Sequence, residues 1–155
     1  MDRPGNMPTN GGISARAHNV QLLKEYLGAL QAGDGETMAS MLAPDLQYWV
    51  SPGSAFSGNH DKASLLSLLP AIFDARDGPS KLTYRYITAE DDRASLVADG
   101  HMPLKAGASY DQTYHWLFRF RGNQIVEVLE YVDILAVWKT FGTPDQKAIA
   151  EASTE

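Results

Sequence analysis

The sequence predicts an α+β domain in which helices cover one face of a curved antiparallel sheet. Its first half holds apolar residues at the spacing of helices, and its second half holds four runs with the alternation of strands. Short turn segments join these runs, which makes consecutive strands antiparallel neighbours. Helices followed by a meander of strands are typical of the α+β class.

Three helices are expected in the first half of the chain. Residues 14–32 repeat apolar side chains at helical spacing, and a shorter helix over 35–43 ends at Pro44, because the residue before a proline avoids the helical conformation. The third helix covers 62–75, with a kink or break expected at Pro70. The expected N-caps are Ser14, Asp34 and either Asp61 or Asn59.

Strands and a closing helix follow. The segment 45–50 is rich in aromatic and branched residues, and 51–59 has the composition of a loop. The turns DD, KAGA and RGN separate the four later runs. The expected strands are 81–90, 93–104, 109–120 and 124–134, and the expected closing helix is 134–141, before Gly142 and Pro144.

One domain is expected, flanked by two tails. Residues 1–13 combine proline, glycine and asparagine in a composition that buries little surface, so a flexible N-terminal tail is expected there. The domain covers 14–142, and 143–155 is expected to be a polar C-terminal tail. No repeat or linker divides the domain.

Composition excludes several classes of protein. Of the 155 residues, 44% are hydrophobic and 21% are charged, close to the averages for globular proteins. The formal net charge of -6 argues against a phosphate-binding surface and therefore against a nucleic-acid partner. No apolar run reaches the ~18 residues that span a bilayer, so no membrane partner is expected. The absence of cysteine and of an apolar leader fits a cytoplasmic protein.

The strand 109–120 has one almost wholly aromatic face. Its other face carries mainly polar and charged residues, so the aromatic face is expected to point into the protein. The residues of this inward face are Tyr110, Gln112, Tyr114, Trp116, Phe118 and Phe120.

The stretch SLVADGHMPL, residues 95–104, carries two titratable groups on one face of its strand, because Asp99 and His101 are two positions apart. The expected register places Asp99 opposite Tyr114 and His101 opposite Gln112. Both groups are therefore expected to point into the concave side of the sheet, where an unpaired carboxylate would be costly.

The RGN turn decides which face of the last strand points inward. A three-residue loop would place Trp116 opposite Val128 and Tyr114 opposite Glu130, and this register is preferred. A loop one residue different would instead turn Glu127 and its alternate neighbours inward. The preferred register brings a small polar group into an apolar, aromatic-lined cup, which is the composition of a small-molecule site: Asp99, His101, Gln112, Tyr114 and Glu130.

The segments YLGALQAGDGETMASMLAPDLQYW, PGSAFSGN and YHWLFRFRGNQIVEVLEYVD resemble the nuclear transport factor 2-like superfamily, and within it the SnoaL-like polyketide cyclase branch. The resemblance covers roughly residues 15–140. It implies a cystatin-like α+β roll with a cone-shaped pocket roofed by helices, commonly dimeric. The superfamily includes isomerases, hydrolases, dehydratases, cyclases and binding proteins, so the resemblance indicates the fold more closely than the activity.

One part of the chain resembles ketosteroid isomerases. Tyr26 precedes Asp34 by eight residues, the spacing of their oxyanion-binding tyrosine. Their general base would fall near Trp49 and their second acid near Trp116. Neither tryptophan can do that chemistry, so steroid isomerisation by that mechanism is not expected.

Two other resemblances concern Asp99. Its separation from Glu130 is similar to that of the two essential aspartates of limonene epoxide hydrolase, but Val97 stands where that enzyme has an arginine. Among SnoaL-like cyclases, acid–base catalysis by an aspartate with a histidine nearby, without metal or cofactor, is the style that Asp99 and His101 resemble best.

These observations favour a cofactor-independent acid–base enzyme that acts on a small, largely apolar oxygenated molecule by isomerisation, cyclisation, hydration or dehydration. Asp99 and His101 are the expected catalytic residues. The expected substrate-binding residues are Tyr26, Trp49, Gln112, Tyr114, Trp116 and Glu130. The alternative is a non-catalytic ligand-binding or interaction module of the same fold.

No metal or cofactor is expected, because the histidines at 18, 60, 101 and 115 are too far apart for a local metal motif. His60 is expected to cap a helix or to lie on the surface. In the preferred register the outer sheet face is apolar, which predicts a homodimer through this face. Its apolar residues are Leu117, Ile125, Leu129 and Tyr131.

Overall fold

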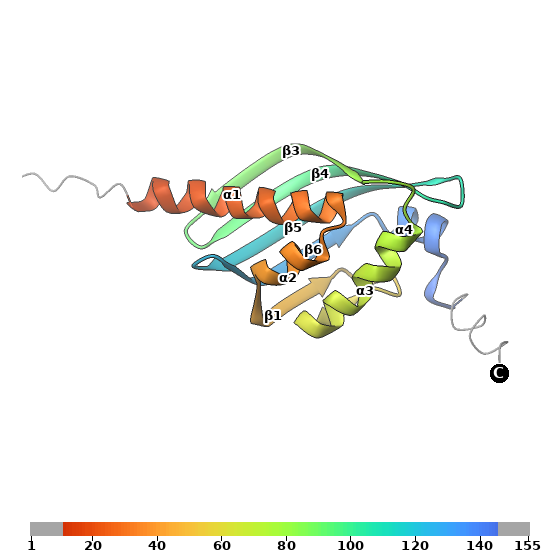
Figure 1. Ribbon diagram of the computed structural model, residues 1–155, viewed down its shortest axis with the longest axis horizontal. Helices are drawn as coiled ribbons and strands as arrows, with labels where there is room; N and C mark the ends of the chain where they lie inside the picture. Colours follow the sequence, from red (N-terminus) through yellow and green to blue (C-terminus); the bar gives the residue numbers. More distant parts are fainter. Residues whose placement is uncertain (1–10, 146–155) are drawn as a thin grey trace, which may run out of the picture.

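A six-stranded sheet forms the frame of the protein, and helices α1, α2 and α3 cover one of its faces (Figure 1). The computed structural model describes residues 11–145. The elements are α1 (Gly11–Ala32), α2 (Gly35–Met41), β1 (Leu42–Val50), β2 (Gly58–His60), α3 (Lys62–Ala75), β3 (Lys81–Glu90), β4 (Arg93–Pro103), β5 (Ser109–Arg121), β6 (Gln124–Val132) and α4 (Ile134–Phe141). The predicted α+β class, with a curved sheet under helices, is confirmed.

The strands follow the order β2-β1-β6-β5-β4-β3. The four later strands form the expected antiparallel meander, joined by short turns. The pair formed by β1 and β6 is parallel instead. Between these two strands the chain passes through β2, α3 and the first three strands of the meander. The short strand β2, which the sequence analysis assigned to a loop, pairs antiparallel with β1 at the edge.

Two helix starts match the expected caps. The Asp34 carboxylate accepts a hydrogen bond from the Thr37 backbone N–H at 3.0 Å, and Asp61 accepts one from the Ser64 N–H at 2.8 Å. Ser14, in contrast, lies inside α1, which begins at Gly11, so the expected cap at this residue is wrong. The rest of the expected tails, 1–10 and 146–155, lies outside the described residues.

Helix α3 runs without a break through Pro70, where a kink or break was expected. Apolar residues on both sides of the proline, Leu69 and Ile72, pack against the interior and hold the helix in place. Among residues 11–145, no helix has both the length and the apolar character needed to cross a membrane.

The core lies between the helices and the concave face of the sheet. Burying a leucine or phenylalanine side chain of this kind contributes roughly 1.5–3 kcal/mol. Ile125 belongs to this core, although the sequence predicted it on the outer face, because a bulge between Arg119 and Phe120 shifts the register of β5 against β6. The largest fully buried side chains are Phe118, Leu23, Leu27, Met38, Leu42, Leu96, Ile125 and Val128.

The outer face of the sheet carries both apolar and charged side chains. Tyr131 is 46% exposed there, and its ring packs edge-on against Trp49 with centroids 5.2 Å apart. Arg119 bridges Asp92 and Glu127 on the same face. The homodimer through this surface stays a prediction.

Candidate functional site

A cavity of about 160 Å³ lies between the helices and the concave face of the sheet. Most of its wall is made of leucine, isoleucine, valine, methionine and phenylalanine side chains from the four helices, from strands β1, β4 and β6, and from the loop before β2. The polar or titratable residues on its wall are Tyr26, Tyr48, Ser54, His60, Tyr110 and Glu130. An apolar cavity with a few convergent polar groups is the usual form of a small-molecule site.

Among the described residues, Glu130 is the only carboxylate that lines the cavity. Strand β6 lies between β1 and β5, so residues of both neighbours flank this side chain. The Tyr48 hydroxyl on β1 donates a hydrogen bond to Glu130 Oε2. Trp116 on β5 is the sheet partner of Glu130 and hydrogen-bonds to its carboxylate through the indole N–H.

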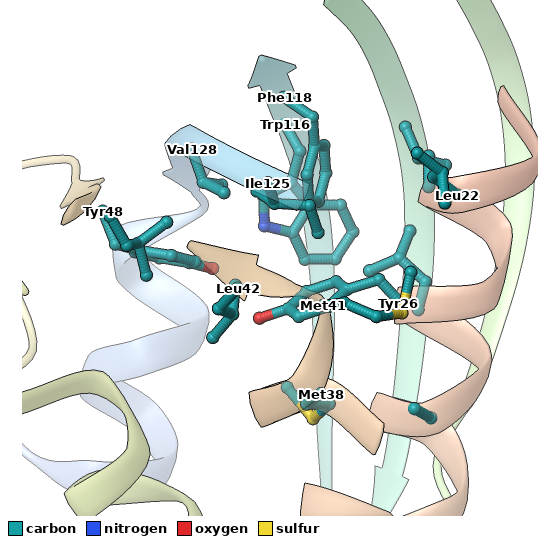
Figure 2. Close-up of a cluster of buried hydrophobic side chains, with 14 of the residues drawn as sticks. Leu22, Tyr26, Met38, Met41, Leu42, Tyr48, Trp116, Phe118, Ile125 and Val128 are labelled. Atoms are coloured by element: carbon teal, nitrogen blue, oxygen red, sulfur yellow. The ribbon is translucent and has the colours of Figure 1, made fainter. Parts of the chain in front are cut away.

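Two tyrosines and a tryptophan from separate elements converge near this carboxylate. Figure 2 shows that the phenolic oxygens of Tyr26 and Tyr48 and the indole nitrogen of Trp116 point toward a common region. Tyr26 comes from α1, where its ring packs edge-on against Phe118 with centroids 5.8 Å apart. The three donors therefore come from a helix and two strands that are distant in the sequence.

Burial raises the pKa of Glu130 above its ordinary value of 4.5. The hydrogen bonds from Tyr48 and Trp116, and the nearby imidazole of His60, act on this pKa in the opposite direction. Because the effect of burial is the largest, the Glu130 carboxyl group takes up a proton more readily than that of an exposed glutamate. A carboxyl group with a raised pKa can act as a proton donor and, once ionised, as a proton acceptor.

Burial also raises the pKa of the Tyr26 and Tyr48 phenols, and the charge of Glu130 adds to both shifts. These phenols remain protonated at physiological pH and act as hydrogen-bond donors. A protonated phenol next to a buried carboxyl group can stabilise negative charge on a ligand oxygen.

His60 lines the cavity, although the sequence predicted a surface or capping role. Its Nε2 lies 2.8 Å from the Phe56 carbonyl oxygen, and its Nδ1 lies 2.9 Å from the Ser64 hydroxyl. Because a carbonyl only accepts, Nε2 carries a proton in this hydrogen bond. The imidazole is thus fixed at the cavity wall, close enough to Glu130 to influence its pKa.

Behind the wall, a second set of polar side chains supports the site. Tyr114 stacks on Trp116, with ring centroids 4.1 Å apart and planes 11° apart. Gln112 donates a hydrogen bond from Nε2 to the Tyr110 hydroxyl at 2.7 Å and accepts one at Oε1 from the Asp133 backbone N–H at 2.6 Å. Tyr114, Trp116 and Gln112, which were expected to bind substrate, face inward but lie behind the residues that line the cavity.

The expected placement of Asp99 and His101 inside the cavity is wrong. The register differs from the expected one by a single residue: Asp99 pairs with Thr113, and His101 pairs with Asp111. A shift of one residue moves every side chain of a strand to the other face. Both groups therefore lie on the outer face, and neither lines the cavity.

Asp99 and His101 each interact with another side chain on the outer face of the sheet. The Asp99 carboxylate binds Arg85 through two hydrogen bonds of 2.6 and 2.7 Å. His101 Nδ1 lies 2.6 Å from an Asp111 carboxylate oxygen. Catalysis by Asp99 and His101 was expected from a place inside the cup, which the structure does not give them.

Trp49 also lies on the outer face, against Tyr131, so its expected place on the cavity wall is wrong. Its neighbour Tyr48 faces the cavity instead. Both residues are aromatic, so alternation alone could not decide between them. Leu46 and Val50, which share the inward face with Tyr48, were the available signal.

The expected inward direction of Glu130 is correct, although its sheet partner is Trp116 rather than Tyr114. Tyr26 lines the cavity as the resemblance to ketosteroid isomerases implied. In the part of the chain that the structure describes, no group of three or more histidine, aspartate or glutamate side chains is arranged to hold a metal ion.

The sequence profile of the SnoaL-like domain matches residues 23–128. The chain belongs to this family. No curated protein sequence matches this SnoaL-like protein.

Solved structures of low sequence identity share its fold. An NTF2-like protein from Burkholderia xenovorans is 20% identical and has a TM-score of 0.64, with 80% of this chain and 95% of that chain covered. An LEH-like epoxide hydrolase from M. tuberculosis is 14% identical with a TM-score of 0.66, covering 90% of this chain and 98% of that one. TerC, co-crystallised with polyporic acid, is 15% identical with a TM-score of 0.67, covering 79% of this chain and 96% of that one.

Proposed function

We propose that this SnoaL-like protein is a cofactor-independent acid–base enzyme whose reactive group is Glu130. The observation that carries the proposal is a partly buried carboxyl group on the wall of an apolar cavity, hydrogen-bonded to Tyr48. Desolvation raises the pKa of Glu130, the direction that suits a carboxyl group acting as a proton donor as well as an acceptor. Structural carboxylates of soluble proteins, in contrast, usually face water or pair with a cation.

The two protonation states of Glu130 supply two kinds of chemistry. The protonated carboxyl group gives a proton to a ligand oxygen, and the carboxylate takes a proton from carbon or water. Tyr26 and Tyr48 donate hydrogen bonds to the oxygen that gains negative charge. An isomerisation returns the abstracted proton to the ligand, so Glu130 ends in its starting state and no other reactant is consumed.

The cavity favours a neutral, largely apolar substrate with at least one oxygen atom. Its wall is mainly aliphatic and aromatic, so burying the apolar surface of a ligand there is favourable. Among its described lining residues, only His60 is able to carry a positive charge, and both of its ring nitrogens are engaged by Phe56 and Ser64. An anionic substrate would therefore find no free cation in the wall.

The similar structures support this class of ligand without defining it. One of them was crystallised with polyporic acid and another is an LEH-like epoxide hydrolase. Those properties belong to the relatives. For this chain they indicate which compounds to test first: quinones, epoxides and unsaturated ketones.

The test is a ligand panel followed by product analysis. Compounds of these three classes are screened by the shift in melting temperature, and each hit is incubated with wild type, Glu130→Gln, Asp99→Asn and Glu127→Gln. Glu127 is the matched control because it lies on the same strand, faces outward and binds Arg119. We expect Glu130→Gln alone to lower turnover, by on the order of a hundredfold or more, while ligand binding is kept.

Two results would contradict the proposal. Loss of turnover in Asp99→Asn with full activity in Glu130→Gln would show that the reaction depends on Asp99 on the outer face and not on Glu130. Ligands that bind to all four proteins and are recovered unchanged would indicate a non-catalytic binding module, the alternative that the sequence left open.

A further inference from the structure

One aromatic ring of the cavity wall, at the end of α4, also reaches the solvent. Among the described residues that line the cavity, Phe141 alone is exposed, with 39% of its surface accessible. Its ring makes edge contacts with Phe56 and Tyr110, at centroid distances of 5.6 and 5.1 Å. Phe141 is therefore in contact with both the cavity and the solvent.

The two ends of α4 are held in different ways. At its start, the backbone of Asp133 is bound on both sides by Gln112, which accepts from the N–H at 2.6 Å and donates to the C=O at 3.1 Å. In the middle, Val137 is buried. The end carrying Phe141 is held by its ring contacts and by a hydrogen bond from the Trp138 indole to the Gly53 carbonyl at 2.7 Å, which is exposed.

The Phe141 ring lies away from the reactive carboxyl group along the sheet. It contacts Tyr110, and Tyr110 precedes Trp116, the sheet partner of Glu130, by six residues on β5. Six residues of a strand correspond to roughly 20 Å. A ligand with its oxygen at Glu130 would therefore direct its apolar end toward Phe141.

The walls near Phe141 are apolar and come from two helices. Ile72 of α3 and Val137 of α4 pack together with Met102 and Tyr110. Figure 1 shows α3 and α4 at the same end of the molecule. A ligand passing between these helices meets mainly hydrocarbon surface, with the Tyr110 ring beside it, on its way to Glu130.

We propose that Phe141 is the gate of the cavity and the residue that limits the length of the ligand. The ligand enters between α3 and α4 when the Phe141 ring turns outward, and the returning ring packs against the end of the ligand's apolar chain. The substrate class is thereby narrowed to an elongated neutral molecule with oxygen at one end. This inference rests on the proposed ligand cavity, but it does not require catalysis.

The test uses linear methyl ketones, from 2-hexanone to 2-tetradecanone, in competition with the neutral fluorescent probe N-phenyl-1-naphthylamine. In wild type we expect affinity to rise about fourfold per added methylene group, since each one is buried, and then to stop rising at a limiting length. Phe141→Ala should move this limit to longer ketones and speed probe association by on the order of tenfold. Phe141→Trp should shorten the limit.

Leu135→Ala is the matched control, because Leu135 is exposed on the same helix but does not line the cavity. Phe141→Leu keeps an apolar contact and replaces Phe141→Ala should the alanine variant fail to fold, as judged by circular dichroism. The same length limit and the same association rate in wild type and in the folded Phe141 variants would overturn the proposal, and so would a failure of every ketone and of the probe to bind. A length limit that responds to Phe141, with turnover unaffected by Glu130→Gln, would refute only the proposed catalysis.

Discussion

The Tyr48 hydroxyl on β1 donates a hydrogen bond to the Glu130 carboxylate on β6, although the two residues are 82 positions apart in the sequence. The parallel pairing of β1 with β6 brings them together, with Val50 opposite Glu130 and Tyr48 opposite Val128. The reactive end of the cavity therefore depends on the parallel pair of β1 and β6, which joins the meander to the first half of the chain. Four predictions follow from this site and from the turns that frame it.

Tyr48→Phe should raise the pKa of Glu130 further, because the hydrogen bond from Tyr48 favours the charged carboxylate. The variant should also lose roughly 1–2 kcal/mol of stability, since a buried acceptor loses its donor. Titration of the Glu130 side-chain carbon signal by NMR measures the first effect, and urea unfolding measures the second. Tyr86→Phe, at a tyrosine that is 72% exposed, is the control and should change neither quantity. An unchanged Glu130 titration in Tyr48→Phe would contradict the hydrogen bond.

The stability of wild type relative to Glu130→Gln should fall as pH rises. The folded-state pKa of Glu130 lies above its unfolded value of about 4.5, so the folded protein binds this proton more tightly. The resulting stabilisation is complete below the unfolded pKa and is lost as pH rises through the folded pKa. Urea unfolding of both proteins between about pH 4 and about pH 8 gives the difference, in which the other titrating groups cancel. A difference that is constant or increases with pH would show that burial does not raise this pKa.

Asp99→Asn should leave stability nearly unchanged and should not reduce ligand binding in the cavity. The Asp99 and Arg85 side chains are 40% and 52% exposed, and ion pairs in such positions contribute about 0–1 kcal/mol. Urea unfolding and the probe-binding assay measure the two quantities. A loss of probe affinity in this variant would mean that the outer face of β4 communicates with the cavity.

Gly33→Ala should destabilise the protein, whereas Gly28→Ala in the same helical region should stabilise it. Gly33 has a φ of +79°, and a Cβ atom there would lie 2.4 Å from an Arg76 guanidinium nitrogen. Arg76 cannot easily move, because its Nη1 donates to the Leu30 and Gln31 carbonyls at the end of α1. Gly28 is exposed and its added methyl group would meet nothing within 4 Å, so the helical preference of alanine is gained, worth up to about 1 kcal/mol.

Thermal unfolding of the two glycine variants and wild type compares these effects directly. Equal melting temperatures for Gly33→Ala and Gly28→Ala would mean that the Arg76 side chain moves away from the added methyl group without loss of stability.

Much of the site follows from patterns within single strands. The aromatic face of β5 points inward as its alternation predicted, because burying several rings on one side of a strand leaves the charged side to water. On β4, Leu96, Ala98 and Met102 alternate with Ser95, Asp99 and His101. If this alternation had been weighted equally with that of β5, it would have placed Asp99 and His101 on the outer face of the sheet. The register assumed across the KAGA turn, with Asp99 opposite Tyr114, led to the wrong face.

The sequence by itself determined the helices, the four strands of the meander, the SnoaL-like resemblance and the inward direction of Glu130. These depend on local periodicity, capping and turn composition, which act over a few neighbouring residues. Only the tertiary structure decided the register of β4 against β5, the parallel pairing of β1 with β6, and the meeting of Tyr26, Tyr48, His60 and Glu130. The physical reason is that register and the pairing of β1 with β6 are set by packing between distant segments, where a shift of one residue reverses a whole face.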